Sequence, residues 1–121
     1  MNYDVVVVGA GNAALCAAIS AKENGASVLV LEKGPKEKSG GNSFFTDGAI
    51  RVGYDDLANI RKVVPLTEEQ AQQIDMPIYT AQDFFDDILT VSQQKSNKEL
   101  VKKLADQSFS TIEWMNSHGV A

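Results

Sequence analysis

The stretch Val5-Val6-Val7-Val8-Gly9-Ala10-Gly11-Asn12-Ala13-Ala14 decides the fold of the first part of the chain. It begins inside a β-branched run, Tyr3–Val8, which is apolar on both faces and predicts a strand buried between helix layers. Gly9–Gly11 predicts a tight turn, and the alanine-rich segment 12–24 predicts a helix. Ser27–Leu31 predicts a second strand, so these pieces make a β-α-β unit of about 30 residues, the shortest parallel crossover.

The rest of the chain turns helical after a polar, glycine-rich loop over 33–41 and an irregular stretch over 42–53. Four helices are then predicted, over residues 55–63, 67–74, 80–93 and 97–119. Their N-cap signals are Thr67 with Gln70 in a capping-box pattern, Thr80, and Asn97. Helical spacing gives two of them an apolar face, formed by Phe84, Phe85, Ile88 and Leu89 and by Val101, Leu104, Ala105, Phe109, Ile112 and Met115.

Two parallel strands are too few for an open sheet, which typically has about four to six. We therefore expect an incomplete doubly wound α/β domain: a Rossmann-type β-α-β unit followed by helices. Residues 1–53 would form the cofactor-binding unit with its loop, and residues 54–121 its helical continuation. The single strand run Tyr3–Val8 would then keep an open edge, which invites pairing with another chain, so we expect dimers or aggregates.

The glycine turn fits a dinucleotide-binding fingerprint with alanine in the third position. Gly9 lets the chain turn sharply out of the strand, Gly11 lets a pyrophosphate approach the backbone, and Ala14 lets the helix pack on the strand. The helix that begins at Asn12 and Ala13 presents free N–H groups and a partial positive charge to the phosphates.

An acidic residue stands where this fingerprint requires one. Glu32 follows the second strand, 21 residues beyond Gly11. A carboxylate there accepts hydrogen bonds from the ribose hydroxyls and repels a 2′-phosphate, which argues against NADP. The fingerprint alone does not decide between FAD and NAD.

A second glycine-rich stretch, Ser39-Gly40-Gly41-Asn42-Ser43, follows about ten residues after Glu32. Its backbone N–H groups and the side chains of Asn42 and Ser43 can reach the same pyrophosphate, a contact that an extended cofactor such as FAD needs. The alternative is a flexible surface loop, and composition alone does not separate the two.

Composition excludes several classes of function. The net charge is −5 and the pI about 4.7, which gives no basic surface for nucleic acid. The run Val5–Val8 is too short to span a membrane and lacks the layout of a signal peptide. Cys16 is the single cysteine, so no internal disulfide forms, and we expect a reducing, cytoplasmic location.

The run GAGNAALCAAISAKENGASVLVLEKGPKEKSGGNSFFTDGAIRVGY resembles the fumarate reductase/succinate dehydrogenase flavoprotein family, whose LEK tripeptide ends the second strand before a GGN[ST] loop. The closer likeness is to tricarballylate dehydrogenases. They share GAGNAALCAA, VLEK, GGNS, a stretch like FTDGA, the YT..DFF.D segment at Tyr79–Asp86 and the WM.SHGV ending at Trp114–Val120. The likeness covers nearly all of the chain.

The resemblance implies FAD as the cofactor and assigns its contacts. Pyrophosphate would be lined by Gly9, Gly11, Asn12 and Ala13. The adenosine ribose would meet Glu32, with Lys33 beside it. Pyrophosphate and ribityl chain would be bound by Gly40, Gly41, Asn42 and Ser43. The isoalloxazine ring would be approached by Thr46, Asp47 and Gly48. Membrane-bound family members attach FAD through a histidine in this loop; this chain has only His118, so we expect FAD to be held non-covalently.

The resemblance also implies an activity: oxidation of a small polycarboxylate, tricarballylate to cis-aconitate, with electrons leaving through an iron–sulfur partner. The substrate-capping domain and the catalytic residues would lie beyond Ala121, so we expect these 121 residues alone to be inactive. The alternatives are a fumarate reductase-like or 3-ketosteroid dehydrogenase-like enzyme with the same cofactor domain. From a different class, the chain could be a non-catalytic nucleotide-binding module or an inert remnant.

The other conspicuous residues are expected to be structural. Cys16 is interpreted as a packed residue of the first helix, and His118 as an exposed residue or a favourable charge near a helix C-terminus. We expect no metal site: Asp83, Asp86 and Asp87 lack the glycine turn of a calcium loop and fit a solvated helix face better. The aromatic residues expected in the core are Phe84, Phe85 and Trp114.

Overall fold

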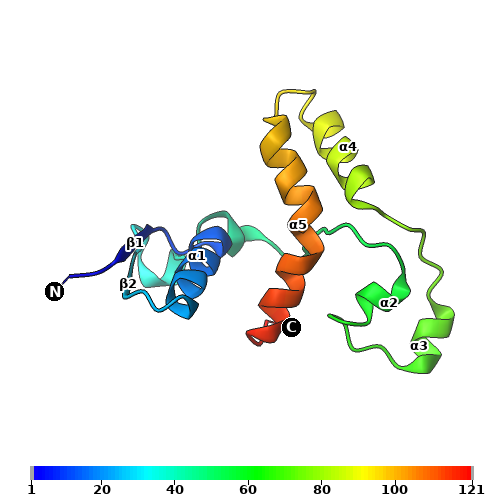
Figure 1. The fold of residues 1–121 in the computed structure, drawn as a ribbon, viewed down its shortest axis with the longest axis horizontal. Coiled ribbons are helices and arrows are strands. Elements are labelled where there is room, and N and C mark those ends of the chain that lie inside the picture. The colour runs from blue at the N-terminus through cyan, green and yellow to red at the C-terminus, as the bar shows by residue number, and fades with distance from the viewer. Residues whose placement is uncertain (1, 121) are drawn as a thin grey trace. The chain divides into compact units, whose positions relative to one another are not determined.

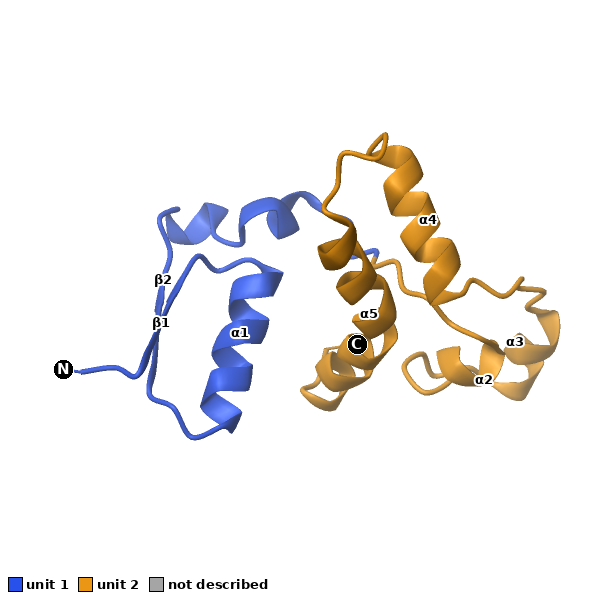
Figure 2. Ribbon diagram, turned by 45° about the horizontal axis from the view of Figure 1, so that its top comes forward, with its two compact units in different colours: residues 1–49 blue, residues 50–121 orange. Residues whose placement is uncertain are grey.

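The computed structural model describes residues 2–120. The chain divides into two compact units, Met1–Ala49 and Ile50–Ala121 (Figures 1 and 2). The first unit contains β1 (Val5–Val8), α1 (Asn12–Glu23), β2 (Val28–Leu31) and the short 3₁₀ helices η1 (Lys36–Lys38) and η2 (Gly41–Phe45). The second contains α2 (Leu57–Ile60), α3 (Glu68–Gln73), α4 (Ala81–Val91) and α5 (Lys98–Ser117).

In the first unit, β1 and β2 form a parallel pair, with Val5 opposite Val28 and Val8 opposite Leu31. Helix α1 connects them and packs against both strands. The predicted order of strand, helix and strand is confirmed, although both strands begin later than expected. The start of the pair is held by side chains: Asp4 Oδ2 accepts hydrogen bonds from the Ser27 N–H at 2.8 Å and the Ser27 hydroxyl at 2.6 Å.

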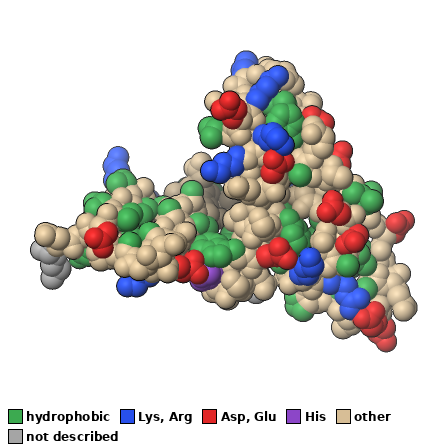
Figure 3. Space-filling view, viewed as in Figure 1, with side chains coloured by type: hydrophobic (Ala, Val, Ile, Leu, Met, Phe, Trp, Pro, Cys, Tyr) green, Lys and Arg blue, Asp and Glu red, His purple; other side chains and the backbone are tan. Residues whose placement is uncertain are grey.

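The two faces of this strand pair differ in exposure. Val5 and Val7 are half-buried, whereas Val6 and Val8 are 52% and 82% exposed. The prediction of a strand buried on both faces is therefore wrong within this unit, because α1 covers one face. Hydrophobic side chains accordingly reach the surface of the N-terminal unit (Figure 3).

The second unit is organised around the pair of helices α4 and α5. The buried hydrophobic side chains of the described residues all belong to this pair: Phe84, Leu89, Val101 and Ala105. Their spacing places them on facing sides of the two helices, as the apolar periodicity predicted. Leu104, which the same periodicity included, is 55% exposed, because the contact on α5 follows Val101, Ala105 and Ser108 instead.

Ser108 is a buried polar residue with both hydrogen-bonding roles filled. Its hydroxyl donates to the Ala105 carbonyl at 2.9 Å and accepts the Gly53 N–H at 3.1 Å. Gly53 is itself buried, and a Cβ added to it would lie 2.8 Å from Ala81 N. The backbone before α2 therefore lies directly against the start of α4, at a distance that only glycine permits.

The helix starts agree with the N-cap signals of the sequence. Thr67 and Gln70 form the predicted capping box at α3, and Thr80 and Asp83 form another at α4. Asn97 Oδ1 accepts the N–H groups of Glu99 and Leu100 at the start of α5. Each cap satisfies amide groups that a helix leaves free at its N-terminus.

The helix ends fall one to three residues short of the predicted ones. Helix α4 ends at Val91, and Gln93 and Gln94 then take positive φ values of 52° and 62°. Helix α5 ends at Ser117 with His118 as its C-cap. The His118 ring lies 4.5 Å from the half-buried Trp114 ring, centroid to centroid.

Candidate functional site

The glycine turn between β1 and α1 has the conformation that its sequence requires. Gly9 has φ +109°, a value that L side chains rarely adopt, and its N–H donates to the Leu31 carbonyl at 2.6 Å. Gly11 is the N-cap of α1, and it has no side chain with which to cap the helix. The first turn of α1 also contains no acidic residue, so no carboxylate within the helix offsets its partial positive charge.

The second glycine-rich loop lies directly on this turn. A Cβ added to Gly11 would lie 3.1 Å from the Gly40 carbonyl oxygen and 3.8 Å from Ser43 Oγ. The Ser43 hydroxyl accepts a hydrogen bond from the Asn12 N–H at 3.2 Å. Gly40 precedes η2 with φ +112°, which gives the loop the sharp turn that brings it back to α1. The structure thus brings together two motifs separated by about 30 residues.

Glu32 reaches the same turn from the end of β2. One carboxylate oxygen accepts the Ala10 N–H at 2.7 Å and the other accepts the Gly34 N–H at 2.6 Å. The residue is exposed, and a carboxylate can accept about four hydrogen bonds, so acceptor capacity remains for hydroxyl groups of a ligand. The first hydrogen bond joins residues 22 positions apart and the second lies within the loop after β2. Residue spacing alone does not reveal either of them.

The remaining predicted residues lie in the same unit and face solvent to different degrees. Thr46 follows η2, and its hydroxyl donates to the Ser43 carbonyl at 3.1 Å, which fixes the end of the loop. Gly48 has φ +78°. Of the predicted site residues, the following are exposed to solvent: Asn12, Ala13, Lys33, Gly41, Asn42, Asp47 and Gly48.

The arrangement suits a ligand in which an anionic group is linked to a group with several hydroxyls. The N-terminus of α1 begins at a turn of small residues, and a helix N-terminus of this kind is a feature that binds phosphate groups. Glu32 supplies a hydroxyl acceptor beside it. The residues present therefore fit a dinucleotide with its diphosphate at the glycine turn.

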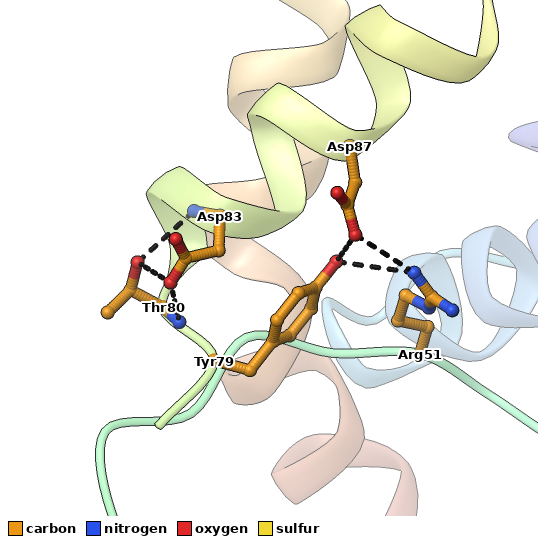
Figure 4. Close-up of polar contacts among 5 residues, drawn as sticks. All are labelled: Arg51, Tyr79, Thr80, Asp83 and Asp87. Carbon is orange, nitrogen blue, oxygen red and sulfur yellow. Dashed lines mark hydrogen bonds and ion pairs between the residues drawn. The ribbon is translucent and has the colours of Figure 1, made fainter. Parts of the chain in front are cut away.

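A polar network in the second unit was not anticipated from the sequence (Figure 4). The Tyr79 hydroxyl donates to Asp87 Oδ2 at 2.7 Å, and Arg51 NH1 lies 3.1 Å from the same oxygen and 3.4 Å from the Tyr79 hydroxyl. Desolvation and the hydrogen bond to Asp87 raise the pKa of Tyr79 above its ordinary value. An open, mainly apolar hollow of about 260 Å³ adjoins Arg51 and Asp87 and is otherwise lined by Phe84, Ile88, Val91 and Ser92.

The three aspartates of α4 have local partners. Asp83 accepts from the Thr80 N–H and hydroxyl, which lowers its pKa, and Asp86 accepts from Gln82 Nε2 at 3.1 Å. Asp87 accepts the Tyr79 hydroxyl, so each of the three exposed carboxylates on this helix face has a hydrogen-bond partner. Within residues 2–120, no group of three or more histidine, cysteine or acidic side chains is placed to hold a metal ion.

Comparison with known proteins identifies the family. The family described as FAD binding domain matches residues 4–121. The chain belongs to this family. FAD is therefore the cofactor of the domain, in agreement with the dinucleotide fingerprint and with the convergence of the two glycine-rich loops at the α1 N-terminus.

Relatives of this FAD binding domain are reductases. The chain is 33% identical to vinyl phenol reductase of Lactiplantibacillus plantarum, over 98% of this chain and 21% of that protein. It is 29% identical to NADH:fumarate oxidoreductase of Klebsiella pneumoniae, over 98% of this chain and 11% of that protein. It is 33% identical to fumarate reductase (cytochrome) of Shewanella frigidimarina, over 96% of this chain and 18% of that protein.

The chain thus spans between 11% and 21% of the length of these relatives. The FAD binding domain and the reductase names of these relatives together indicate a family of flavin-dependent oxidoreductases. The helices within residues 2–120 include none with the length and apolar character needed to cross a membrane.

Proposed function

We propose that this chain holds FAD non-covalently, with the diphosphate at the N-terminus of α1 and the adenosine ribose at Glu32. The observation that carries the proposal is the contact between the two glycine-rich loops: Ser43 Oγ lies 3.2 Å from Asn12 N, and Gly40 lies against Gly11. Lys33 would lie beside the ribose. Thr46, Asp47 and Gly48 would continue toward the isoalloxazine ring.

Substitution of Gly11 tests this placement. We expect Gly11→Val to abolish FAD binding, because the added side chain would fill the space between the turn and Gly40. Ala17→Val, on the exposed part of α1, is the control and should bind FAD like the unmodified chain. Binding is measured by flavin fluorescence on titration, and release of free FAD after acid precipitation tests the non-covalent mode. Equal binding by both variants would overturn the placement.

We further propose that the parent activity is the interconversion of a carbon–carbon single bond and a double bond in a small polycarboxylate. FAD supplies the hydride acceptor, and the protein binds and orients it. Tricarballylate, oxidised to cis-aconitate, is the first candidate because of the GGNS, YT..DFF.D and WM.SHGV motifs. The residues that handle the substrate would lie outside these 121 residues, so the chain alone would be inactive.

A fumarate reductase-like activity is the second candidate, and the names of two relatives favour it. A 3-ketosteroid dehydrogenase-like activity uses the same cofactor domain. Assays of a longer protein containing this domain on tricarballylate, succinate and a 3-ketosteroid, with an artificial electron acceptor, would separate the three. Turnover of succinate but not tricarballylate would overturn the first candidate. A chain that takes up no FAD would instead support a non-catalytic remnant.

Electron transfer, location and assembly follow as parts of the same proposal. Electrons would leave through an iron–sulfur partner in the cytoplasm. Self-association would use the strand pair, whose outer edges are open within its unit and whose Val6 and Val8 side chains are exposed. Light scattering of the purified chain tests this, and a monomer at high concentration would contradict it.

A further inference from the structure

Arg51 is held in a defined orientation at the surface of the second unit (Figure 4). Its NH1 atom lies 3.1 Å from Asp87 Oδ2 and 3.4 Å from the Tyr79 hydroxyl, and its guanidinium carbon lies 5.7 Å from the centre of the Tyr79 ring. The Tyr79 hydroxyl in turn donates to Asp87 Oδ2 at 2.7 Å. One side chain of α4 and one from the segment before it thus orient a single cation.

This orientation leaves one edge of the guanidinium open. Both contacts of Arg51 use NH1, and no acceptor among residues 2–120 takes the N–H groups of Nε or NH2. The Arg51 side chain is 66% exposed, so a ligand can reach it. Arginine has five N–H donors in a planar fork, and the edge formed by Nε and NH2 can bind both oxygens of one carboxylate.

An apolar hollow adjoins this arginine. It has a volume of about 260 Å³, and its lining is formed by Arg51, Phe84, Asp87, Ile88, Val91 and Ser92. Pockets for drug-sized ligands typically measure about 300–1,000 Å³, so this hollow suits a smaller molecule. The Ser92 hydroxyl already donates to the Leu89 carbonyl at 3.3 Å. Apart from its two charged residues, the hollow therefore offers a ligand mainly hydrocarbon surface.

We propose that this hollow binds a small monocarboxylate with an apolar body, its carboxylate on Nε and NH2 of Arg51 and its carbon chain along Ile88 and Val91. Asp87 contacts the guanidinium at NH1 and leaves the other edge to the ligand. Its repulsion of the ligand is offset in part because Tyr79 also donates to Asp87 Oδ2.

The lining favours one carboxylate over several. A second charge would lose its hydration against apolar side chains without gaining a partner. The net charge of −5 also disfavours the approach of a polyanion. The site lies wholly within the second unit and goes beyond FAD binding, and its occupation does not require the cofactor.

Hexanoate is the probe, and NMR of the ¹⁵N-labelled 121-residue chain without FAD is the measurement. The sequence has two arginines, so Arg51→Gln and Arg61→Gln assign the two Nε–H signals. We expect hexanoate to shift the Arg51 signal and the amides of Ile88 and Val91 saturably. Arg61, whose guanidinium is paired with Glu68, should not respond. Acetate should bind more weakly, since each buried methylene strengthens binding by about 4-fold, and hexanamide should also bind more weakly because it lacks the charge.

Two variants test the charged and the apolar parts of the site separately. Arg51→Gln should weaken hexanoate binding by about 10-fold or more, because it removes charged hydrogen bonds. Val91→Glu should also weaken it, because the added carboxylate repels the ligand at the hollow. Leu100→Glu is the matched control and should bind like the unmodified chain. Val91 and Leu100 are 85% and 68% exposed, so neither change removes core packing.

Saturable shifts in the unmodified chain and in Leu100→Glu, with weaker binding by Arg51→Gln and Val91→Glu, support the site. Shifts no larger than those caused by sodium chloride at the same ionic strength overturn it, as does equal binding by Arg51→Gln and Arg61→Gln. The dispersion of the amide spectrum verifies the fold of each variant. Because FAD is absent from this titration, failure here leaves the proposed FAD site standing, and failure of FAD binding leaves this result unaffected.

Discussion

Each of the two units of this chain is stabilised internally by a different kind of interaction. Residues 50–120 bury apolar side chains between α4 and α5, with Leu89 and Ala105 only 6% and 1% exposed. Among the described residues of the first unit, no hydrophobic side chain reaches that degree of burial. That unit is joined by hydrogen bonds that the side-chain oxygens of Asp4, Glu32 and Ser43 accept from backbone N–H groups distant in sequence.

The difference indicates what each unit requires to be stable. Apolar burial is the dominant favourable contribution to folding, so the helical unit carries its own stabilisation. The β-α-β unit depends on polar contacts around glycine backbone, each of which contributes about 0.5–1.5 kcal/mol net. A ligand that binds only the folded form adds stability, so FAD should stabilise the first unit more than the second.

The largest effect is expected in the helical unit from Leu89→Ala. Loss of a buried leucine side chain typically lowers the free energy of unfolding by about 2–5 kcal/mol. Leu104→Ala, on the exposed side of α5, should change it by less than about 0.5 kcal/mol. Amide exchange resolved along the chain is the measurement. An equal loss of protection in residues 2–49 would show that the two units do not differ as described.

A smaller loss of stability is expected from Gly53→Ala, because the Gly53 backbone packs against the backbone at the start of α4. The Cβ of Gly53→Ala would lie 2.8 Å from Ala81 N, so the start of α4 must shift. Such overpacking costs about 1–3 kcal/mol. Gly119→Asn is the control, because that position has open space and a φ of +83° that asparagine tolerates. Thermal unfolding followed by circular dichroism compares the two, and an unchanged transition in Gly53→Ala would contradict the close approach.

Acidification should affect the first unit through Asp4. Hydrogen bonds from the Ser27 side chain and backbone lower the pKa of Asp4 below its ordinary value of 3.8. Because the folded-state pKa is lower, the stabilisation is complete above the ordinary value and is lost as the pH falls through the folded-state value. Asp4→Asn should remove this pH dependence from residues 2–49. Amide exchange between pH 5 and pH 3 measures it, and an identical pH profile in both proteins would exclude Asp4 as its source.

The smallest effect concerns the ionisation of Tyr79 in the second unit. Its pKa is raised by desolvation and by Asp87, while Arg51 acts in the opposite direction. Asp87→Asn should lower the pKa of Tyr79, and Arg51→Gln should raise it further. In the unmodified chain, the associated stability is present below the ordinary value of 10.0 and is lost as the pH rises through the folded-state value. Tyrosinate absorbance is the measurement, and shifts of the same sign in both variants would contradict the network.

Local signals in the sequence predicted local structure well. The strand, turn and helix around Gly9 were predictable because glycine, alanine and β-branched residues each favour one backbone conformation. The caps at Thr67, Thr80 and Asn97 were predictable for the same reason, since a side chain and the amide it caps lie within three residues. FAD as cofactor was predicted from the glycine loops together with the resemblance.

Contacts between distant residues were not predictable in this way. The burial of Ser108 depends on Gly53, 55 residues away, and a serine within a helical pattern otherwise indicates a solvent-facing position. Leu104 has the same spacing as its apolar neighbours, and only the direction from which α4 approaches leaves it exposed. The hydrogen bond that Glu32 accepts from the Ala10 N–H, 22 residues away, likewise depends on how the end of β2 lies beside the glycine turn.

The position of Trp114 makes the chain its own optical probe. It is the single tryptophan, it lies on α5, and its ring is 4.5 Å from that of His118. Its emission therefore reports on the helical unit, and the β-α-β unit contributes no indole signal.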